Sequence, residues 1–194
     1  MPHVLEKNRF DPIPEELAAK MHKMIAIIQF KVEGQTIMNH PEFKLDHRLM
    51  LDKINFDDGT VNCYGEVYPI KDTNLPTIDP ADPYKLSPEE EEVMVALEAS
   101  ITNSKKLQEH INFLYTHGAL FTTYNGNLLF HGCIPFTEDG DFMEVTIAGK
   151  TNHGAGLMRQ LDQELREVYF NPRCDLDKAD AANLMWYLWL GPDS

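Results

Sequence analysis

The sequence predicts a mixed α and β fold in which helices and strands do not alternate regularly. Helical patterns dominate the first and last parts of the chain, and two glycine turn signals, Asp58-Gly59 and Asn125-Gly126, are each flanked by strand-like runs. The expected order is therefore helices, hairpin, helices, strands and helix. A doubly wound fold would need repeated βα units, so this order predicts the α+β class.

The first half of the chain predicts a long helix, a small sheet and a rigid loop. Residues 14–38 begin with a proline and two acids, which is typical of a helix start, and carry apolar residues at three-and-four spacing. The expected apolar stripe is Leu17, Met21, Met24, Ile25, Ile28 and Val32. Residues 51–64 predict a hairpin around an Asp-Gly turn, residues 65–70 a third strand, and the proline-rich residues 76–83 a loop.

The middle of the chain predicts two consecutive helices. Ser87-Pro88-Glu89-Glu90 has a serine N-cap, a proline in the first turn and a glutamate three residues after the cap. Asn103-Ser104 should end this helix. Residues 105–115 predict the next one, and its expected inward side chains are Leu107, Ile111 and Leu114.

The last third predicts a second hairpin, a strand and two helices. Residues 119–124 and 127–131 read as strands joined by Asn-Gly, the preferred pair of a type I′ turn. Residues 142–147 predict another strand. Residues 157–169 and 180–190 predict helices from their apolar periodicity.

Composition and charge exclude several classes of function. Apolar residues make up 43% of the chain, which indicates a globular protein. The net charge of −14 argues against a nucleic-acid partner or an anionic membrane, whereas an anionic small molecule stays open because a bound metal can reverse the local field. The three cysteines form no CxxC pair and indicate reduced thiols in the cytoplasm. We expect neither a signal peptide nor a membrane span.

The segment Tyr124–Pro135 contains the strongest candidate for a functional residue. Its apolar run ends on His131, and Gly132 follows at once. A strand fixes the backbone of a histidine at its end, and the glycine lets the chain turn away without a Cβ clash. This arrangement is a common way to present a metal ligand. Periodicity alone supports a neutral, hydrogen-bonded strand-end histidine about equally well.

The same segment resembles the corresponding part of class III fructose-1,6-bisphosphatase, the type found in Firmicutes and some other bacteria. The further matching strings are Ala26–Gln35, Leu49–Ile54, Tyr68–Thr73, Leu114-Tyr115 with Gly118, and Leu184–Trp189. The resemblance covers nearly the whole chain. It implies part of a calcineurin-like metallophosphoesterase domain over residues 1–194, built as a sandwich of sheets flanked by helices. Residues 119–150 would supply strands of it, and residues 42–86 would be a family-specific insertion.

The resemblance also implies a chemistry. The family hydrolyses fructose 1,6-bisphosphate, a small sugar bisphosphate, in gluconeogenesis with divalent metal, Mn²⁺ being the expected ion. His131 would be one ligand of a two-metal centre whose ions, roughly 3.5–4 Å apart, clamp the phosphoryl group and the attacking oxygen. The sequence identifies no other catalytic residue and no binding residue for an organic cofactor. A homo-oligomer is left open.

The departures from the family pattern are as informative as the match. The family's other ligand motifs, Asp-x-His, Gly-Asp-x-x-Asp-Arg, Gly-Asn-His-Asp and Gly-His-Thr-Pro, are absent from this sequence. The chain therefore resembles an internal fragment, and we expect it to be inactive by itself, with uncovered sheet edges and apolar faces. The alternative is a non-catalytic remnant or interaction module with the same fold.

Other candidate residues have simpler structural explanations. The acidic turns at residues 57–59 and 138–141 lack the ligand spacing of calcium loops, so we expect plain turns. Cys133 is expected to be buried and inert, His153 to lie in a turn, and Trp186 and Trp189 to be core residues. The cations that could meet a substrate phosphate are Lys71, Lys105, Lys106 and Arg159, and nothing in the sequence selects among them.

Overall fold

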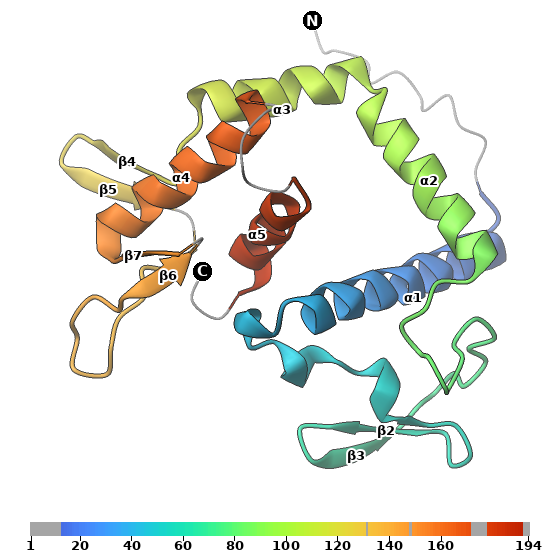
Figure 1. The fold of residues 1–194 in the computed structure, drawn as a ribbon. Helices are drawn as coiled ribbons and strands as arrows, with labels where there is room; N and C mark the ends of the chain where they lie inside the picture. Colours follow the sequence, from blue (N-terminus) through green and yellow to red (C-terminus); the bar gives the residue numbers. More distant parts are fainter. Residues whose placement is uncertain (1–12, 131, 148, 172–177, 192–194) are drawn as a thin grey trace, which may run out of the picture. The chain divides into compact units, whose positions relative to one another are not determined.

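The structure is a computed structural model that describes residues 13–130, 132–147, 149–171 and 178–191. It confirms the mixed α+β class (Figure 1). The chain divides into two compact units, Met1–Val93 and Met94–Ser194, and helix α2 (Pro88–Thr102) begins in the first and ends in the second. No helix in the described ranges is long and apolar enough to cross a membrane.

The first unit contains a long helix followed by a three-stranded antiparallel sheet. Its elements are α1 (Glu15–Asn39), the 3₁₀ turns η1 (Pro41–Phe43), η2 (Asp46–Arg48) and η3 (Leu51–Lys53), and strands β1 (Ile54–Asn55), β2 (Thr60–Cys63) and β3 (Glu66–Pro69). The sheet order is β1-β2-β3, and Thr60 pairs with Pro69. The predicted hairpin and third strand are therefore confirmed.

The turn between β1 and β2 is held by the Asn55 side chain. Its Oδ1 accepts hydrogen bonds from the backbone N–H groups of Asp57 (3.0 Å) and Asp58 (3.2 Å). Gly59 adopts φ +63°, a left-handed conformation that favours glycine. The predicted turn is confirmed, but residues 51–53 form a 3₁₀ turn instead of a strand. Leu51 is buried there, and its N–H donates to the Tyr84 hydroxyl at 3.1 Å.

The core of the first unit is small and centres on Tyr84. Ile27, Leu51, Ile78 and Tyr84 form one buried cluster. The Tyr84 ring lies against Gly34 of α1, where an added Cβ would come within 2.1 Å of a ring carbon. The Tyr84 hydroxyl donates to Asp52 at 2.5 Å, and burial together with that carboxylate raises the pKa of Tyr84 to about 12.

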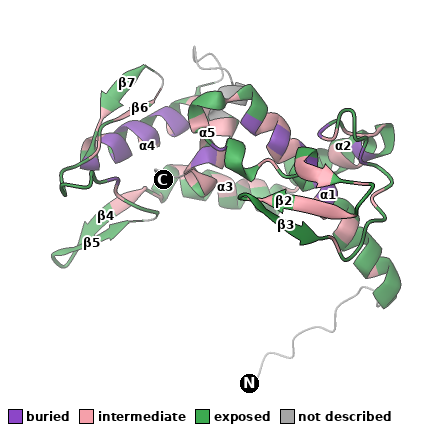
Figure 2. Cartoon of the chain, turned by 90° about the horizontal axis from the view of Figure 1, so that it is seen from below, coloured by how far each residue is buried: buried purple, intermediate pink, exposed green. Residues whose placement is uncertain are grey.

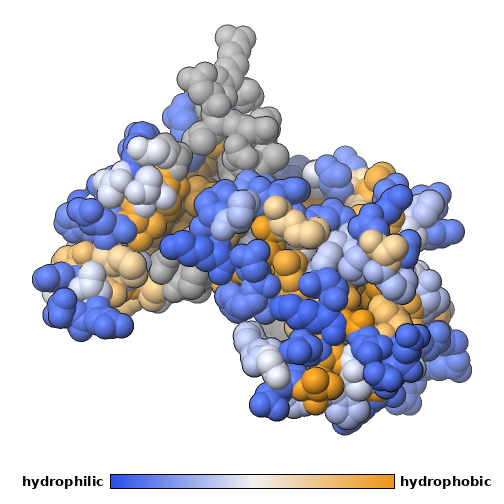
Figure 3. Space-filling model, turned by 60° about the horizontal axis from the view of Figure 1, so that its bottom comes forward, coloured by the Kyte–Doolittle hydropathy of each residue, from blue (hydrophilic) through white to orange (hydrophobic). Residues whose placement is uncertain are grey.

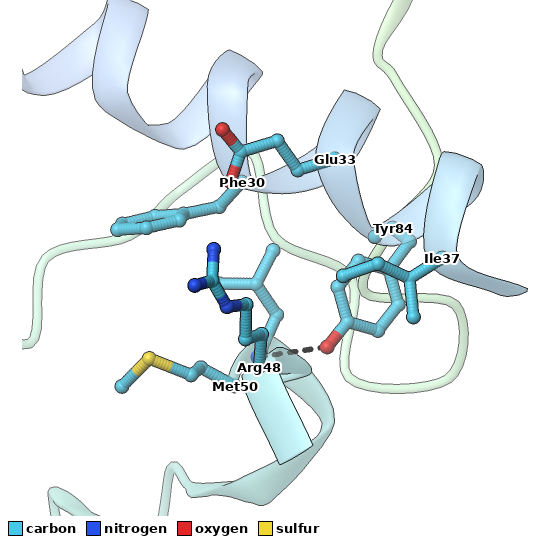
Figure 4. Close-up of a pocket in the computed structure, with 8 residues that line it drawn as sticks. Phe30, Glu33, Ile37, Arg48, Met50 and Tyr84 are labelled. Atoms are coloured by element: carbon cyan, nitrogen blue, oxygen red, sulfur yellow. Dashed lines mark hydrogen bonds between the residues drawn. The ribbon is translucent and has the colours of Figure 1, made fainter. Parts of the chain in front are cut away.

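A pocket beside this core is lined by α1 and the turns that follow it. Figure 4 shows Phe30, Glu33 and Ile37 on α1, with Arg48 extending toward the helix from the opposite wall. The cavity volume is about 10 Å³, which is room for about one water molecule. A sugar bisphosphate could not enter it.

The predicted apolar face of α1 is only partly correct. Leu17, Met21, Met24 and Ile25 are 41–48% exposed. The buried positions are Ile27, Ile28, Lys31, Gly34 and Ile37, all in the C-terminal two thirds of the helix. The reason is that the segment from η1 to Tyr84 covers only that part of α1, so the first turns present their apolar residues to solvent.

A buried ion pair joins α1 to the start of α2. The Lys31 ammonium donates to Glu90 Oε2 at 2.7 Å and to the Thr77 carbonyl at 2.5 Å, and both charged side chains are 3% exposed or less. Glu90 Oε2 also accepts from Ser87 N–H, while Ser87 Oγ accepts from Glu90 N–H. These reciprocal bonds are the predicted capping box. Burial raises the pKa of Glu90, but the bonds from Lys31 and Ser87 outweigh it and leave that pKa below its ordinary value.

The second unit packs short helices and two hairpins around one helix, α4. Its elements after α2 are α3 (Lys105–His117), β4 (Phe121–Tyr124), β5 (Asn127–Phe130), β6 (Val145–Ile147), β7 (Lys150–Asn152), α4 (Gly154–Phe170) and α5 (Lys178–Leu190). Each hairpin is a separate two-stranded antiparallel sheet. The predicted strand at residues 142–147 begins only at Val145, because Phe142 instead bridges Phe136, and β7 was not predicted.

Helix α4 carries most of the burial in this unit (Figure 2). Leu157, Met158, Leu161 and Leu165 are 3–8% exposed. By contrast, α3 has no buried residue, and the predicted inward residues Leu107 and Leu114 are 36% and 63% exposed.

The prediction that both tryptophans are core residues is wrong for Trp189. Its exposed fraction is 79%, while its neighbour Tyr187 is only 9% exposed. Figure 3 shows apolar side chains reaching the surface between polar ones. The described elements are too few to cover every apolar face that the sequence builds.

Candidate functional site

The candidate site is the β4–β5 hairpin that leads to His131. Phe121 pairs with Phe130 and Tyr124 with Asn127, so the two strands are joined through Asn125-Gly126 as predicted. Asn125 (φ +51°) and Gly126 (φ +74°) both adopt the positive φ that a type I′ turn requires. Strand β5 ends at Phe130, one residue before position 131.

His131 itself lies outside the described residues. Its neighbour Gly132 adopts φ +81°, which confirms that the chain turns where glycine was expected. Cys133 is exposed and has a free thiol, so the prediction of a buried cysteine is wrong. The loop after Gly132 leaves the Cys133 side chain exposed, whereas Pro135, two residues after Cys133, is buried.

The root of the hairpin is held by α4. The Arg166 guanidinium donates from Nη1 to the Tyr115 carbonyl and from Nη2 to the Gly118 carbonyl. Asp162, one turn earlier, accepts from Arg166 Nε at 2.9 Å. The Arg159 guanidinium lies 5.5 Å from the centre of the Phe121 ring in β4.

The sequence interpretation missed this role of Arg166. The Asp162–Arg166 spacing of four residues is a readable signal for a helical ion pair. The acceptor carbonyls belong to a segment about 50 residues away in sequence, and no local pattern predicts them.

The other hairpin, β6–β7, is attached to a different side of α4. Gln160 donates to the Ile147 carbonyl at 2.9 Å and accepts from Asn152 at 2.5 Å. Lys150 Nζ lies 3.3 Å from Glu164 Oε1. Within the described part of the chain, Glu164 Oε2 is buried and has no hydrogen-bond partner.

The remaining candidates are not brought together. His153 was expected in a turn, but it is the extended residue between β7 and α4, and its ring stacks on Phe142 with centroids 6.2 Å apart. Lys71 and Lys106 are exposed, and Lys105 lies 3.9 Å from Glu109 on its own helix. Both acidic turns are plain turns, and Gly140 N–H donates to the Thr137 carbonyl in the second one.

A metal centre would require several ligating side chains close together. Among residues 13–130, 132–147, 149–171 and 178–191, no three His, Cys, Asp or Glu side chains gather where they could hold a metal ion. A two-metal centre needs several such ligands, and a lone neutral imidazole binds a divalent ion weakly. The described side chains alone therefore do not fit such a centre.

The described residues define a mixed α+β protein in which a tight Asn-Gly hairpin precedes position 131. The chain belongs to the Firmicute fructose-1,6-bisphosphatase family, whose family model matches residues 1–194. This finding confirms the resemblance seen in the sequence.

The similar curated proteins carry the same name. The chain is 52% identical over 194 residues to "Fructose-1,6-bisphosphatase class 3" of Clostridium tetani, covering 100% of this chain and 29% of that protein. It is 50% identical over 178 residues to the protein of that name from Clostridium novyi, covering 92% of this chain and 27% of the relative. The chain thus spans less than a third of the length of these relatives. No solved structure matches it.

Proposed function

We propose that this polypeptide contributes to fructose-1,6-bisphosphatase activity in a complete class 3 protein. The observation that carries the proposal is the 52% identity over the entire chain to a protein of that name. In the reaction, the oxygen of water forms a bond to the phosphorus of the 1-phosphate and the bond from that phosphorus to the sugar oxygen breaks. A proton passes to the sugar oxygen, and the products are fructose 6-phosphate and phosphate.

Within this reaction, His131 is proposed as a ligand to one of two divalent ions, with Mn²⁺ the expected metal. Two observations support the proposal: β5 ends at Phe130, the residue before His131, and Gly132 has a positive φ, which lets the chain turn there. Bound ions would supply Lewis-acid stabilisation of the phosphoryl group. We also propose that the hairpins are parts of a calcineurin-like sandwich in the complete protein, which would function in the cytoplasm.

The 194-residue chain alone is proposed to be inactive, because its other ligand motifs are missing. Phosphate release should be measured with the pure chain, Mn²⁺ and fructose 1,6-bisphosphate, next to the complete Clostridium tetani protein. We expect release at the no-enzyme background for the chain and turnover for the complete protein. Turnover by the chain comparable to that of the complete protein would contradict the proposal.

The second candidate is a non-catalytic remnant or interaction module. The observation that favours it is the lack of a metal-ligand group among the described residues. The genomic sequence on both sides of this coding region separates the two readings. Gly-Asp-x-x-Asp-Arg upstream and Gly-His-Thr-Pro downstream, in frame or one frameshift away, would support the enzyme, and their absence would support the remnant.

A further inference from the structure

We propose that Arg166 is the positioning residue for the β4–β5 hairpin. The guanidinium of Arg166 binds two carbonyls, Tyr115 and Gly118, that flank the end of α3. Gly118 lies three residues before β4 begins at Phe121. One side chain therefore fixes the point from which the hairpin projects.

The carbonyls are ones that a helix leaves without partners. Tyr115 is in the last turn of α3, and Gly118 is the residue just after that helix. The last carbonyls of a helix accept no hydrogen bond from within the helix. A cation near this end can donate hydrogen bonds to them and also interacts favourably with the helix dipole. The planar fork of arginine suits a bridge between two acceptors, whereas lysine offers a point charge.

Arg166 is itself held in place for this role. Asp162 accepts from Nε at 2.9 Å and from Nη2 at 3.3 Å, so the carboxylate orients the guanidinium plane. The Tyr115 ring stacks on Tyr169, with centroids 4.0 Å apart and planes 2° from parallel. The Arg166 and Asp162 side chains are only 28% and 33% exposed, which limits competition from water.

The hairpin needs such an anchor because little else holds it. All residues of β5 are exposed, and in β4 only Phe121 is partly covered. An isolated two-stranded hairpin is marginally stable in water. The position of β5 therefore depends on the root at Tyr115–Gly118. The importance for catalysis rests on the proposed function of His131, but the anchoring does not.

Hydrogen–deuterium exchange of the full chain at short labelling times tests the proposal. In Arg166→Met, we expect amides of residues 114–124 to exchange about tenfold faster than in the wild type, because lost charge-assisted bonds lower the free energy of local opening. Residues 145–152 should keep their wild-type rates. In Arg166→Lys, the effect on residues 114–124 should be intermediate.

A matched control removes the other attachment of α4. Gln160→Leu loses the bonds to Ile147 and Asn152, so residues 145–152 should exchange faster while residues 114–124 do not. Unchanged exchange of residues 114–124 in Arg166→Met would overturn the proposal. So would equal acceleration of both regions in each variant, or a wild type with no protection at residues 114–124. None of these results depends on enzymatic activity, so they leave the proposed function to its own assay.

Discussion

The first unit joins distant segments through buried polar groups, whereas the second leaves the apolar strand of its candidate site in solvent. Lys31 and Glu90 are 59 residues apart and meet at 2.7 Å, with both side chains almost fully buried. Leu128, Leu129 and Phe130 of β5 are 47–53% exposed. The first unit therefore contains a buried ion pair between distant segments. The apolar side chains of β5 have no such packing partner among the described residues.

The largest expected effect is the loss of the buried ion pair. Lys31→Met leaves the Glu90 carboxylate buried without its cation, which should cost about 3–5 kcal/mol of unfolding free energy. Urea denaturation followed by circular dichroism measures it. Both tryptophans lie in α5 of the second unit, so their fluorescence reports that unit separately.

The exposed pair Lys20–Glu16 provides the control for this variant. The two side chains meet at 2.6 Å but are 70% and 82% exposed. Lys20→Met should cost only about 0.5 kcal/mol or less, because exposed pairs contribute little. A loss of similar size in Lys31→Met and Lys20→Met would contradict the assignment of Lys31–Glu90 as a stabilising buried contact of the first unit.

A smaller effect on the unfolding free energy is expected when the pH is lowered. The pKa of Glu90 lies below its ordinary value of 4.5, so its contribution to stability is present above that pH. This contribution should be lost as the pH falls below 4.5 and through the lower pKa of Glu90 in the folded state. The reason is that Glu90 binds a proton more readily in the unfolded chain than in the folded one. Unfolding free energies measured from pH 6 to pH 3 should fall more steeply in the wild type than in Glu90→Gln. Equal slopes would show that Glu90 is not the group involved.

The smallest effect is expected in the hairpin. Leu129 is 53% exposed, so Leu129→Ala should change the unfolding free energy by about 0.5 kcal/mol or less. Leu161, which is 5% exposed on α4, is the contrasting site, and Leu161→Ala should cost about 2–5 kcal/mol. A large loss in Leu129→Ala would mean that the hairpin is covered in solution, and sedimentation would then show whether a second copy covers it.

Local chemistry explains which parts of the fold could be predicted from the sequence. The Ser87 capping box, the Asp58-Gly59 turn and the Asn125-Gly126 turn are set by residues within a few positions of one another, and all three are confirmed. The burial of Lys31 could not be predicted, because its partners Thr77 and Glu90 are 46 and 59 residues away.

The same reasoning applies to the candidate site. The Asn125-Gly126 hairpin and the turn at Gly132 could be predicted, because they depend on neighbouring residues. The hydrogen bond from Arg166 to the Gly118 carbonyl could not, because the two residues are 48 positions apart. The exposed faces of α1 and α3 were predicted to be inward because periodicity identifies an apolar stripe without identifying what covers it. The role of His131 stays a prediction.

The exposed Trp189 has a practical consequence. An indole in water emits at long wavelength, and its emission moves to shorter wavelength when an apolar surface excludes the water. Trp189 is 79% exposed near the end of α5, so its emission wavelength reports whether this part of the helix is in contact with water. A polypeptide that covers this part of the helix should therefore shift the emission of Trp189 to shorter wavelength, which can be measured without an added label.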